Sequence, residues 1–204
     1  ALQGIKRAEH ADRVHALLVQ AADFESQQKY GEAAASYEKA FGLDKFSASA
    51  QQGKSRALRL EQETKFSLAF NTAKAAYDTR NWPVAITEFE KALKVTPKNA
   101  EVQGLLTSAR EKAHKDAVDT AVAKAFAYEN QYQWKEARGA YYETLQLKPD
   151  HVEAKEGYAR TGKVIRTLLE YHKMIEVAEQ KAARAEFQAA IRDAEPGPGY
   201  PDRL

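Results

Sequence analysis

The chain has 204 residues, of which 44% are hydrophobic and 29% are charged, and its formal net charge at pH 7 is +2. This hydrophobic content excludes an intrinsically disordered chain, and the absence of cysteine excludes disulfides and thiolate metal sites. No apolar run approaches the ~20 residues that a membrane-spanning helix needs. Alanine is frequent while glycine and proline number only 10 and 6, which favours an all-α fold with well over three-quarters of its residues helical.

Long and short helical patterns alternate along the chain. Residues 2–29 form the first predicted helix, and a short helix follows from Gly31 to about Leu43. At 1.5 Å per residue, a pattern of ~30 residues makes a helix of ~45 Å. Three such long patterns without proline come later, from about Phe46 to Arg80, from Ala100 to about Asn130 and from His151 to about Arg184.

Each long pattern is interpreted as one continuous helix, because neither glycine nor proline interrupts its middle. The alternative is a third helix in each unit, with breaks near Thr64, Asp116 and Thr167.

One glycine lies near the start of each long pattern, at Gly53, Gly104 and Gly157. Since a glycine inside a helix costs about 1 kcal/mol relative to alanine, we expect neighbouring helices to cross closely at these positions. The alternative is a frayed first turn, in which glycine is tolerated.

The stretch NWPVAITEFEKALKVTP, residues 81–97, has two relatives in the chain, and Asn81 is its candidate N-cap. A central alanine recurs every 52 residues, with one aromatic residue three positions before it and another four positions after it. These positions are Tyr30, Ala33 and Tyr37, then Trp82, Ala85 and Phe89, then Trp134, Ala137 and Tyr141. Matched positions at one period are typical of a repeat protein. We expect the first aromatic of each set to pack between the two helices of its own unit.

The repeat predicts one domain over residues 1–194, with units of about 1–45, 46–97 and 98–149 and a degenerate capping unit at 150–194. In the capping unit, residues between Met174 and Ile191 echo the pattern with a shift of one residue. Residues 195–204 are rich in proline and glycine and are expected to form an irregular tail or a linker. Since the chain begins at Ala1 rather than at methionine, we expect a processed form or an excised domain.

The short-helix pattern resembles the second half of a tetratricopeptide (TPR) repeat, in which alanine is followed by an aromatic residue and then by proline. Ala85, Phe89 and Pro97 match that motif, and the third set matches it equally well, whereas Lys45 replaces the proline in the first. The ordinary repeat has 34 residues, so we assign the additional residues of each 52-residue unit to a longer first helix. The resemblance implies an α-solenoid of antiparallel helix pairs in a TPR-like right-handed superhelix. It further implies a scaffold or adaptor that binds a peptide or protein segment in a concave groove.

The resemblance places the partner-binding groove on the first helix of each unit. The groove residues are Phe70, Asn71, Lys74, Tyr77, Asp78, Val122, Phe126 and Glu129. Aromatic residues flanked by charges are typical of interface centres. The alternative is that Phe70 and Phe126 fill the core between the long helices.

A second candidate surface is a basic ladder on the long helices, which would bind an anionic polymer or a nucleic acid. Its residues are Lys54, Arg56, Arg59, Arg110, Lys112, Lys115, Arg160, Lys163 and Arg166. Acidic residues lie among them, so the alternative is a solvated surface with ion pairs one helical turn apart. A third hypothesis is self-association through exposed edges of the solenoid.

The sequence contains no recognisable catalytic or metal-binding motif. None of the five histidines belongs to an H-E-x-x-H pattern, and glycine-rich nucleotide loops and a G-x-S-x-G motif are absent. We therefore expect no enzymatic activity, no metal, no cofactor and no small-molecule substrate, and a protein or peptide as the partner rather than a nucleic acid. The alanine-rich units resemble bacterial envelope repeat proteins loosely, which favours the periplasm or cell envelope over the cytoplasm.

Overall fold

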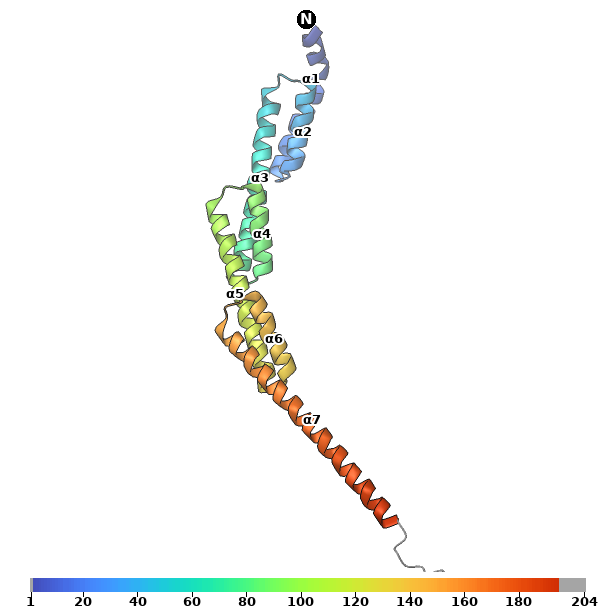
Figure 1. Ribbon diagram of the computed structural model, residues 1–204. Helices are drawn as coiled ribbons and strands as arrows, with labels where there is room; N and C mark the ends of the chain where they lie inside the picture. Colours follow the sequence, from blue (N-terminus) through green and yellow to red (C-terminus); the bar gives the residue numbers. More distant parts are fainter. Residues whose placement is uncertain (1, 195–204) are drawn as a thin grey trace, which may run out of the picture. The chain divides into compact units, whose positions relative to one another are not determined.

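The computed structural model describes the backbone of residues 2–194 and the side-chain surroundings of residues 10–193, and 89% of the described chain is helical (Figure 1). No strand occurs in this range, so the predicted all-α fold and its high helix content are confirmed. The tail predicted at 195–204 lies outside the described residues. The helices are α1 (Leu2–Ser26), α2 (Tyr30–Leu43), α3 (Ala48–Asp78), α4 (Trp82–Val95), α5 (Ala100–Asn130), α6 (Trp134–Leu147) and α7 (Val152–Ala194).

The long helices are continuous. Helices α3 and α5 have 31 residues each and α7 has 43, and no break occurs at Thr64, Asp116 or Thr167. The alternative of a third helix in each unit is therefore wrong. Continuity follows from the sequence, because the middle of these segments has no proline to remove a backbone hydrogen bond and no glycine to lower helix propensity.

Each of these long helices begins at a side-chain cap. The Ser47 hydroxyl accepts a hydrogen bond from the Ala50 backbone N–H at 3.3 Å, and Asn99 Oδ1 accepts one from Val102 N–H at 3.1 Å. Ahead of α7, His151 Nδ1 accepts a hydrogen bond from the Ala154 backbone N–H at 3.3 Å. The three caps are 52 residues apart and were not found in the sequence analysis. By contrast, Asn81 occupies the N-cap position of α4 without a side-chain hydrogen bond.

Tight turns, each with one residue in the left-handed conformation, connect α1, α3 and α5 to the short helices that follow them. Gln28, Arg80 and Tyr132 have φ angles of 58°, 58° and 59°. After α3, the Asn81 N–H bonds to the carbonyl of Ala76 at 2.8 Å, which closes a Schellman motif around Arg80. Glycine is the usual residue at this position, so three larger side chains here retain some backbone strain.

The chain packs as two compact units, Ala1–Ala113 and His114–Leu204, and α5 contributes to both. In the first unit, consecutive helices pack against each other as in an α-solenoid, and alanines lie at the contacts between them. Its clusters centre on Ala33 and Tyr37 between α1, α2 and α3, and on Ala85 and Phe89 between α3, α4 and the start of α5. The core of the second unit is centred on Tyr141, with alanines of α5, α6 and α7 around it.

The aromatic residues at the starts of the short helices differ in burial. Trp82 is buried, and its ring meets the edge of Tyr77 on α3 with ring centroids 5.4 Å apart, as expected. Tyr30 and Trp134 are only half-buried. Trp134 contacts Tyr132 in the preceding turn and lies beside α7.

The glycine prediction is correct at two positions and wrong at the third. A Cβ atom on Gly53 or Gly157 would collide with the ring of Tyr37 or Tyr141, so the helices do cross closely there. Gly104 is exposed, with no atom within 4 Å of such a Cβ. The residue that lies 52 positions after Gly53 is Leu105, so Gly104 is one position out of register.

Helix α7 runs past α6 without folding back, as its orange-to-red end shows in Figure 1. The echo between Met174 and Ile191 therefore lies on one helix and does not form a helix pair. Every residue from Arg166 to Gln188 is exposed. The second half of α7 thus presents all its faces to solvent within the described chain.

Candidate partner-binding groove between α6 and α7

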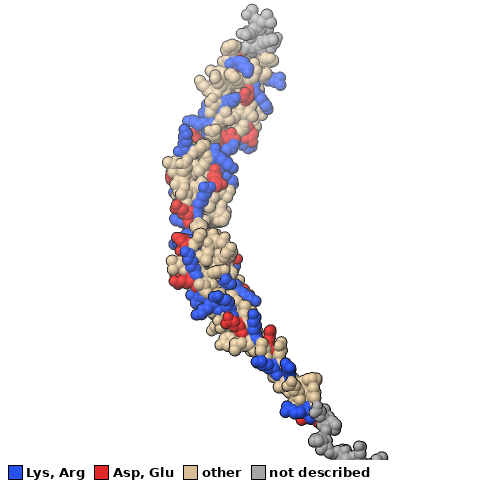
Figure 2. All heavy atoms as spheres, viewed as in Figure 1, with Lys and Arg blue, Asp and Glu red and all other residues tan. Residues whose placement is uncertain are grey.

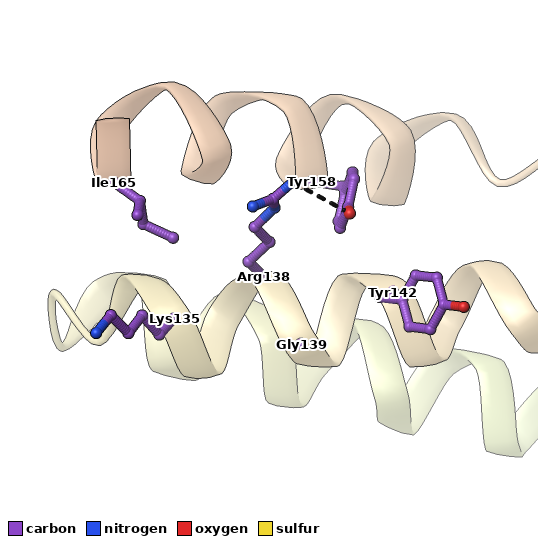
Figure 3. A pocket seen from close by; sticks show the side chains of 6 residues that line it. All are labelled: Lys135, Arg138, Gly139, Tyr142, Tyr158 and Ile165. Atoms are coloured by element: carbon purple, nitrogen blue, oxygen red, sulfur yellow. Dashed lines mark hydrogen bonds between the residues drawn. The ribbon is translucent and has the colours of Figure 1, made fainter. Parts of the chain in front are cut away.

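A cavity of about 420 Å³ opens between α6 and the first half of α7 (Figure 3). Arg138 extends from α6 toward α7, and Tyr158 of α7 meets it (Figure 3). The guanidinium lies 4.5 Å from the centroid of the Tyr158 ring, and its Nη2 donates a hydrogen bond to the Tyr158 hydroxyl at 3.1 Å. The cavity is lined by Lys135, Arg138, Gly139, Tyr142, Tyr158 and Ile165.

A second cavity of about 560 Å³ continues along the same two helices. It shares Lys135 and Ile165 with the first, so we treat both as one α6–α7 groove. In this second cavity, α7 contributes apolar side chains, and His172, Glu136 and Glu176 add polar groups. The additional lining residues are Tyr132, Gln133, Trp134, Glu136, Leu168, Leu169, His172 and Glu176.

The groove contains a buried donor that the protein leaves unpaired. Within the described chain, Arg138 Nε is buried and has no hydrogen-bond acceptor. A buried unpaired donor costs about 1–3 kcal/mol, more for a charged group. Nε is not accessible in this conformation, but Arg138 lines the cavity. A turn of its side chain would present Nε to an incoming acceptor such as a carboxylate, which would remove this penalty and add a charge-assisted hydrogen bond.

The pair of Arg138 and Tyr158 replaces an apolar pair of the preceding repeat. At the positions 52 residues earlier stand Ile86 and Leu106, which belong to the apolar core around Phe89. The substitution of a cation and a phenol for two aliphatic side chains opens and polarises this helix crossing. The sequence analysis missed these residues, although the superposition of the repeat units reveals an arginine at an otherwise apolar position.

Of the residues in the groove predicted from the family resemblance, some are exposed and others pack inside the protein. On α3, Phe70 is half-buried and stacks on Phe66 with ring centroids 5.7 Å apart, while the exposed residues are Asn71, Lys74 and Asp78. Phe70 also meets Phe89 of α4, so part of this ring packs against the core between the helices.

Tyr77 belongs to a contact between α3 and α5. Its hydroxyl lies 2.9 Å from Ser108 Oγ and accepts a hydrogen bond from Lys112 Nζ at 2.6 Å. These two bonds, that from Lys112 first, lower the pKa of Tyr77 because they stabilise the phenolate. The ring also packs against Trp82, so most of this side chain is engaged within the protein.

In the second unit, the predicted groove residues on α5 also make internal contacts. Val122 is buried, and Phe126 remains 38% exposed while its ring meets Tyr141 edge-on at 5.9 Å. Glu129 receives a two-pronged ion pair from Arg160, with N–O distances of 2.6 and 2.9 Å, and a hydrogen bond from the Tyr141 hydroxyl at 2.5 Å. We call these three residues the Glu129 clamp.

The electrostatics of the clamp follow from its geometry. The bonds from Arg160 lower the pKa of Glu129 against the opposing effect of burial, and the bond from Tyr141 lowers it further. Burial, followed by the bond to Glu129, raises the pKa of Tyr141 to about 12. Glu25, Tyr37 and Arg56 form a related clamp 104 residues earlier, in which Arg56 donates to both other side chains.

The residues of the predicted basic ladder mostly face acids of their own protein. Arg110 pairs with Glu90 at 2.7 Å, and Lys54 pairs with Glu38. Arg59 lies 3.9 Å from Glu63, and Arg56 and Arg160 belong to the clamps. Lys115, Lys163 and Arg166 are exposed. In Figure 2 the basic and acidic side chains are interspersed on the visible face, without a continuous basic surface.

Two further features concern the described residues as a whole. No group of three or more histidine, aspartate or glutamate side chains within that range could hold a metal ion. No helix in it has the length and hydropathy needed to cross a membrane.

Comparison with known proteins yields little. No family model matches the sequence, and no curated protein matches it. A solved structure that resembles it is a C-terminal TPR-containing domain from Plasmodium falciparum, belonging to a protein described as FK506-binding. The two share 16% sequence identity over 77% of this chain and 91% of the other, with a TM-score of 0.25. At this TM-score the likeness is too low to transfer an architecture or a partner.

Proposed function

We propose that this protein is a TPR-like interaction scaffold and that it binds a segment of a partner protein in the α6–α7 groove. The observation that carries the proposal is the buried, unpaired Arg138 Nε in a groove with aromatic and aliphatic walls. The recurring alanine and aromatic positions of the short helices support a TPR-like relationship.

The lining of the groove defines the chemistry of the partner. Arg138 provides positive charge beside Tyr142 and Tyr158, whose ring centroids are 6.2 Å apart, while Lys135 lies toward the Ile165 end of the cavity (Figure 3). Ile165 and Leu168 make the wall beyond them apolar. A segment with a carboxylate beside one or two aromatic or aliphatic side chains satisfies both parts of this surface.

The residues predicted on α3 form a second proposed binding surface. Its exposed part consists of Asn71, Lys74 and Asp78. It offers less apolar area than the α6–α7 groove because Phe70 and Tyr77 are engaged internally. Lys74→Glu distinguishes the two surfaces, since Lys74 is exposed and lies outside the α6–α7 groove.

The test is selection of peptides from a random library displayed on phage, followed by fluorescence anisotropy with the selected peptides. We expect peptides that combine acidic with aromatic or aliphatic residues. Arg138→Ala should weaken their binding by roughly tenfold or more, as the loss of an interface anchor does. Arg166→Ala is the matched control, because Arg166 is exposed and does not line the groove.

Peptides that bind Arg138→Ala and the unmodified protein equally well would refute the α6–α7 groove. If the same peptides lose affinity with Lys74→Glu, the predicted surface on α3 is the binding surface. A steep decrease of affinity with salt for a polyanion such as heparin, together with no selected peptide, would favour the basic ladder. Circular dichroism checks that every variant is folded.

A further inference from the structure

The uncovered half of α7 carries an ordered apolar pattern. Apolar residues recur at spacings of three and four, the spacing of the a and d positions of a coiled coil, with three large residues followed by four alanines. This α7 stripe consists of Leu168, Tyr171, Ile175, Ala178, Ala182, Ala185 and Ala189. Leu168, Tyr171 and Ile175 are 41%, 59% and 55% exposed.

The stripe has no covering helix within the described chain. In α3, by contrast, Ala69 and Ala73 pack against Ala85 and Phe89 of the next short helix. Within the described residues α7 continues straight to Ala194, and no short helix returns over its stripe there. Three heptads of apolar surface, ~33 Å long, are thus left without a covering helix in that part of the chain.

We propose that the α7 stripe pairs with the same stripe of a second copy of this chain, in a parallel, in-register, two-stranded coiled coil. Leu168, Ile175 and Ala182 then occupy a positions and Tyr171 and Ala178 occupy d positions. A β-branched residue such as Ile175 at an a position is typical of two-stranded parallel coiled coils. The alanines toward the C-terminal end allow the two helices to approach closely.

The charges beside the stripe favour the parallel orientation. Lys181 occupies a g position and Glu186 the e position of the next heptad, which face each other between the strands of a parallel coiled coil. By two-fold symmetry this ion pair forms twice. In an antiparallel coil the e positions face each other instead, which would bring Glu179, Glu186 and Asp193 against the same acids of the second copy.

The chain has no cysteine, so a single introduced cysteine reports the pairing directly. In a parallel, in-register coil, residue 175 lies opposite itself, and Ile175→Cys should form a disulfide-linked dimer on mild oxidation. The matched control is Lys173→Cys on the outer face of the coil, which should remain monomeric in denaturing electrophoresis. Sedimentation equilibrium of the unmodified 204-residue chain should show a dimer.

Charge exchange provides the second test. Lys181→Glu and Glu186→Lys should each raise the dimer dissociation constant by roughly tenfold, because each places like charges opposite each other twice. A mixture of the two variants should restore the affinity, since every facing pair is then opposite in charge. Neither Lys181 nor Glu186 lines the α6–α7 groove, although Leu168 belongs to both the groove and the α7 stripe. Peptide binding measured at concentrations where the protein is monomeric should therefore not change.

Three results would overturn the proposal. One is a monomer at a concentration of tens of micromolar in sedimentation. Another is equal cross-linking of the variants at positions 173 and 175. The third is a mixture of the two charge variants that associates no better than either variant alone.

Discussion

The ring of Tyr141 on α6 lies against the backbone of Gly157 on α7, where a Cβ atom added to the glycine would be only 2.3 Å from the ring Cζ. Tyr141 is fully buried, and its hydroxyl donates a hydrogen bond to Glu129. The ring therefore cannot retreat without loss of the Glu129 clamp. Tyr37 and Gly53 have the same relationship in the first unit.

Gly157→Ala is expected to destabilise the protein by about 1–3 kcal/mol, although alanine is the better helix former. The added methyl group must displace a buried ring that is fixed on α6. Gly104→Ala is the matched control, since Gly104 has open space around it, and this change should raise stability by up to about 1 kcal/mol. Urea denaturation followed by circular dichroism measures both. Equal effects of the two changes would contradict the close crossing.

Trp82→Ala should lower the free energy of unfolding by roughly 3–5 kcal/mol, because the indole is buried against Tyr77. Trp134→Ala should cost about half as much, since Trp134 is half-buried at the rim of the α6–α7 groove. The comparison is made by urea denaturation with far-ultraviolet circular dichroism. A loss below 1 kcal/mol for Trp82→Ala would show that this residue does not hold α3 and α4 together.

Arg80→Gly should increase stability by roughly 0.5–1 kcal/mol. Arg80 has φ 58°, and glycine adopts this left-handed conformation without the clash of a Cβ atom. The gain is partly offset by the greater freedom of glycine in the unfolded chain. Thr79→Gly, one residue earlier at φ −90°, is the control and should reduce stability. Thermal unfolding measures the stability of both variants. A loss of stability with Arg80→Gly would contradict backbone strain at Arg80.

The Glu129 clamp should make stability depend on acid pH. The pKa of Glu129 is lowered in the folded state, so its contribution is fully present above the ordinary value of 4.5 and is lost as the pH falls through the folded value. Glu129→Gln should therefore cost about 1–2 kcal/mol at pH 7, a moderate amount because Arg160 is half-exposed. The difference from the unmodified protein should shrink below pH 4.5.

Urea denaturation at pH 7 and at pH 3.5 measures this dependence. Glu156→Gln is the control, because Glu156 is exposed on the same helix as Arg160, and it should change stability little at either pH. A Glu129→Gln effect that is equally large at both pH values would show that packing, rather than the ion pair, accounts for the loss.

Local patterns in the sequence were enough to predict the helices and their order. The spacing of apolar residues and the absence of internal breakers depend on neighbours within one or two turns, so α3 and α5 could be anticipated as continuous. The recurrence of Trp82, Ala85 and Phe89 likewise located the short helices, because the same contact needs the same side chains in each unit.

The candidate site was decided by tertiary packing, which the pattern of a single helix does not contain. An apolar face indicates that something covers it, but not which helix does so. Phe70 and Tyr77 are therefore occupied by α4 and α5, although they have the composition of a binding surface. Conversely, the groove around Arg138 exists because this arginine meets Tyr158 where the preceding repeat has two aliphatic residues. The uncovered stripe of α7 has the same origin, since whether a helix folds back over it depends on contacts between distant segments and not on local periodicity.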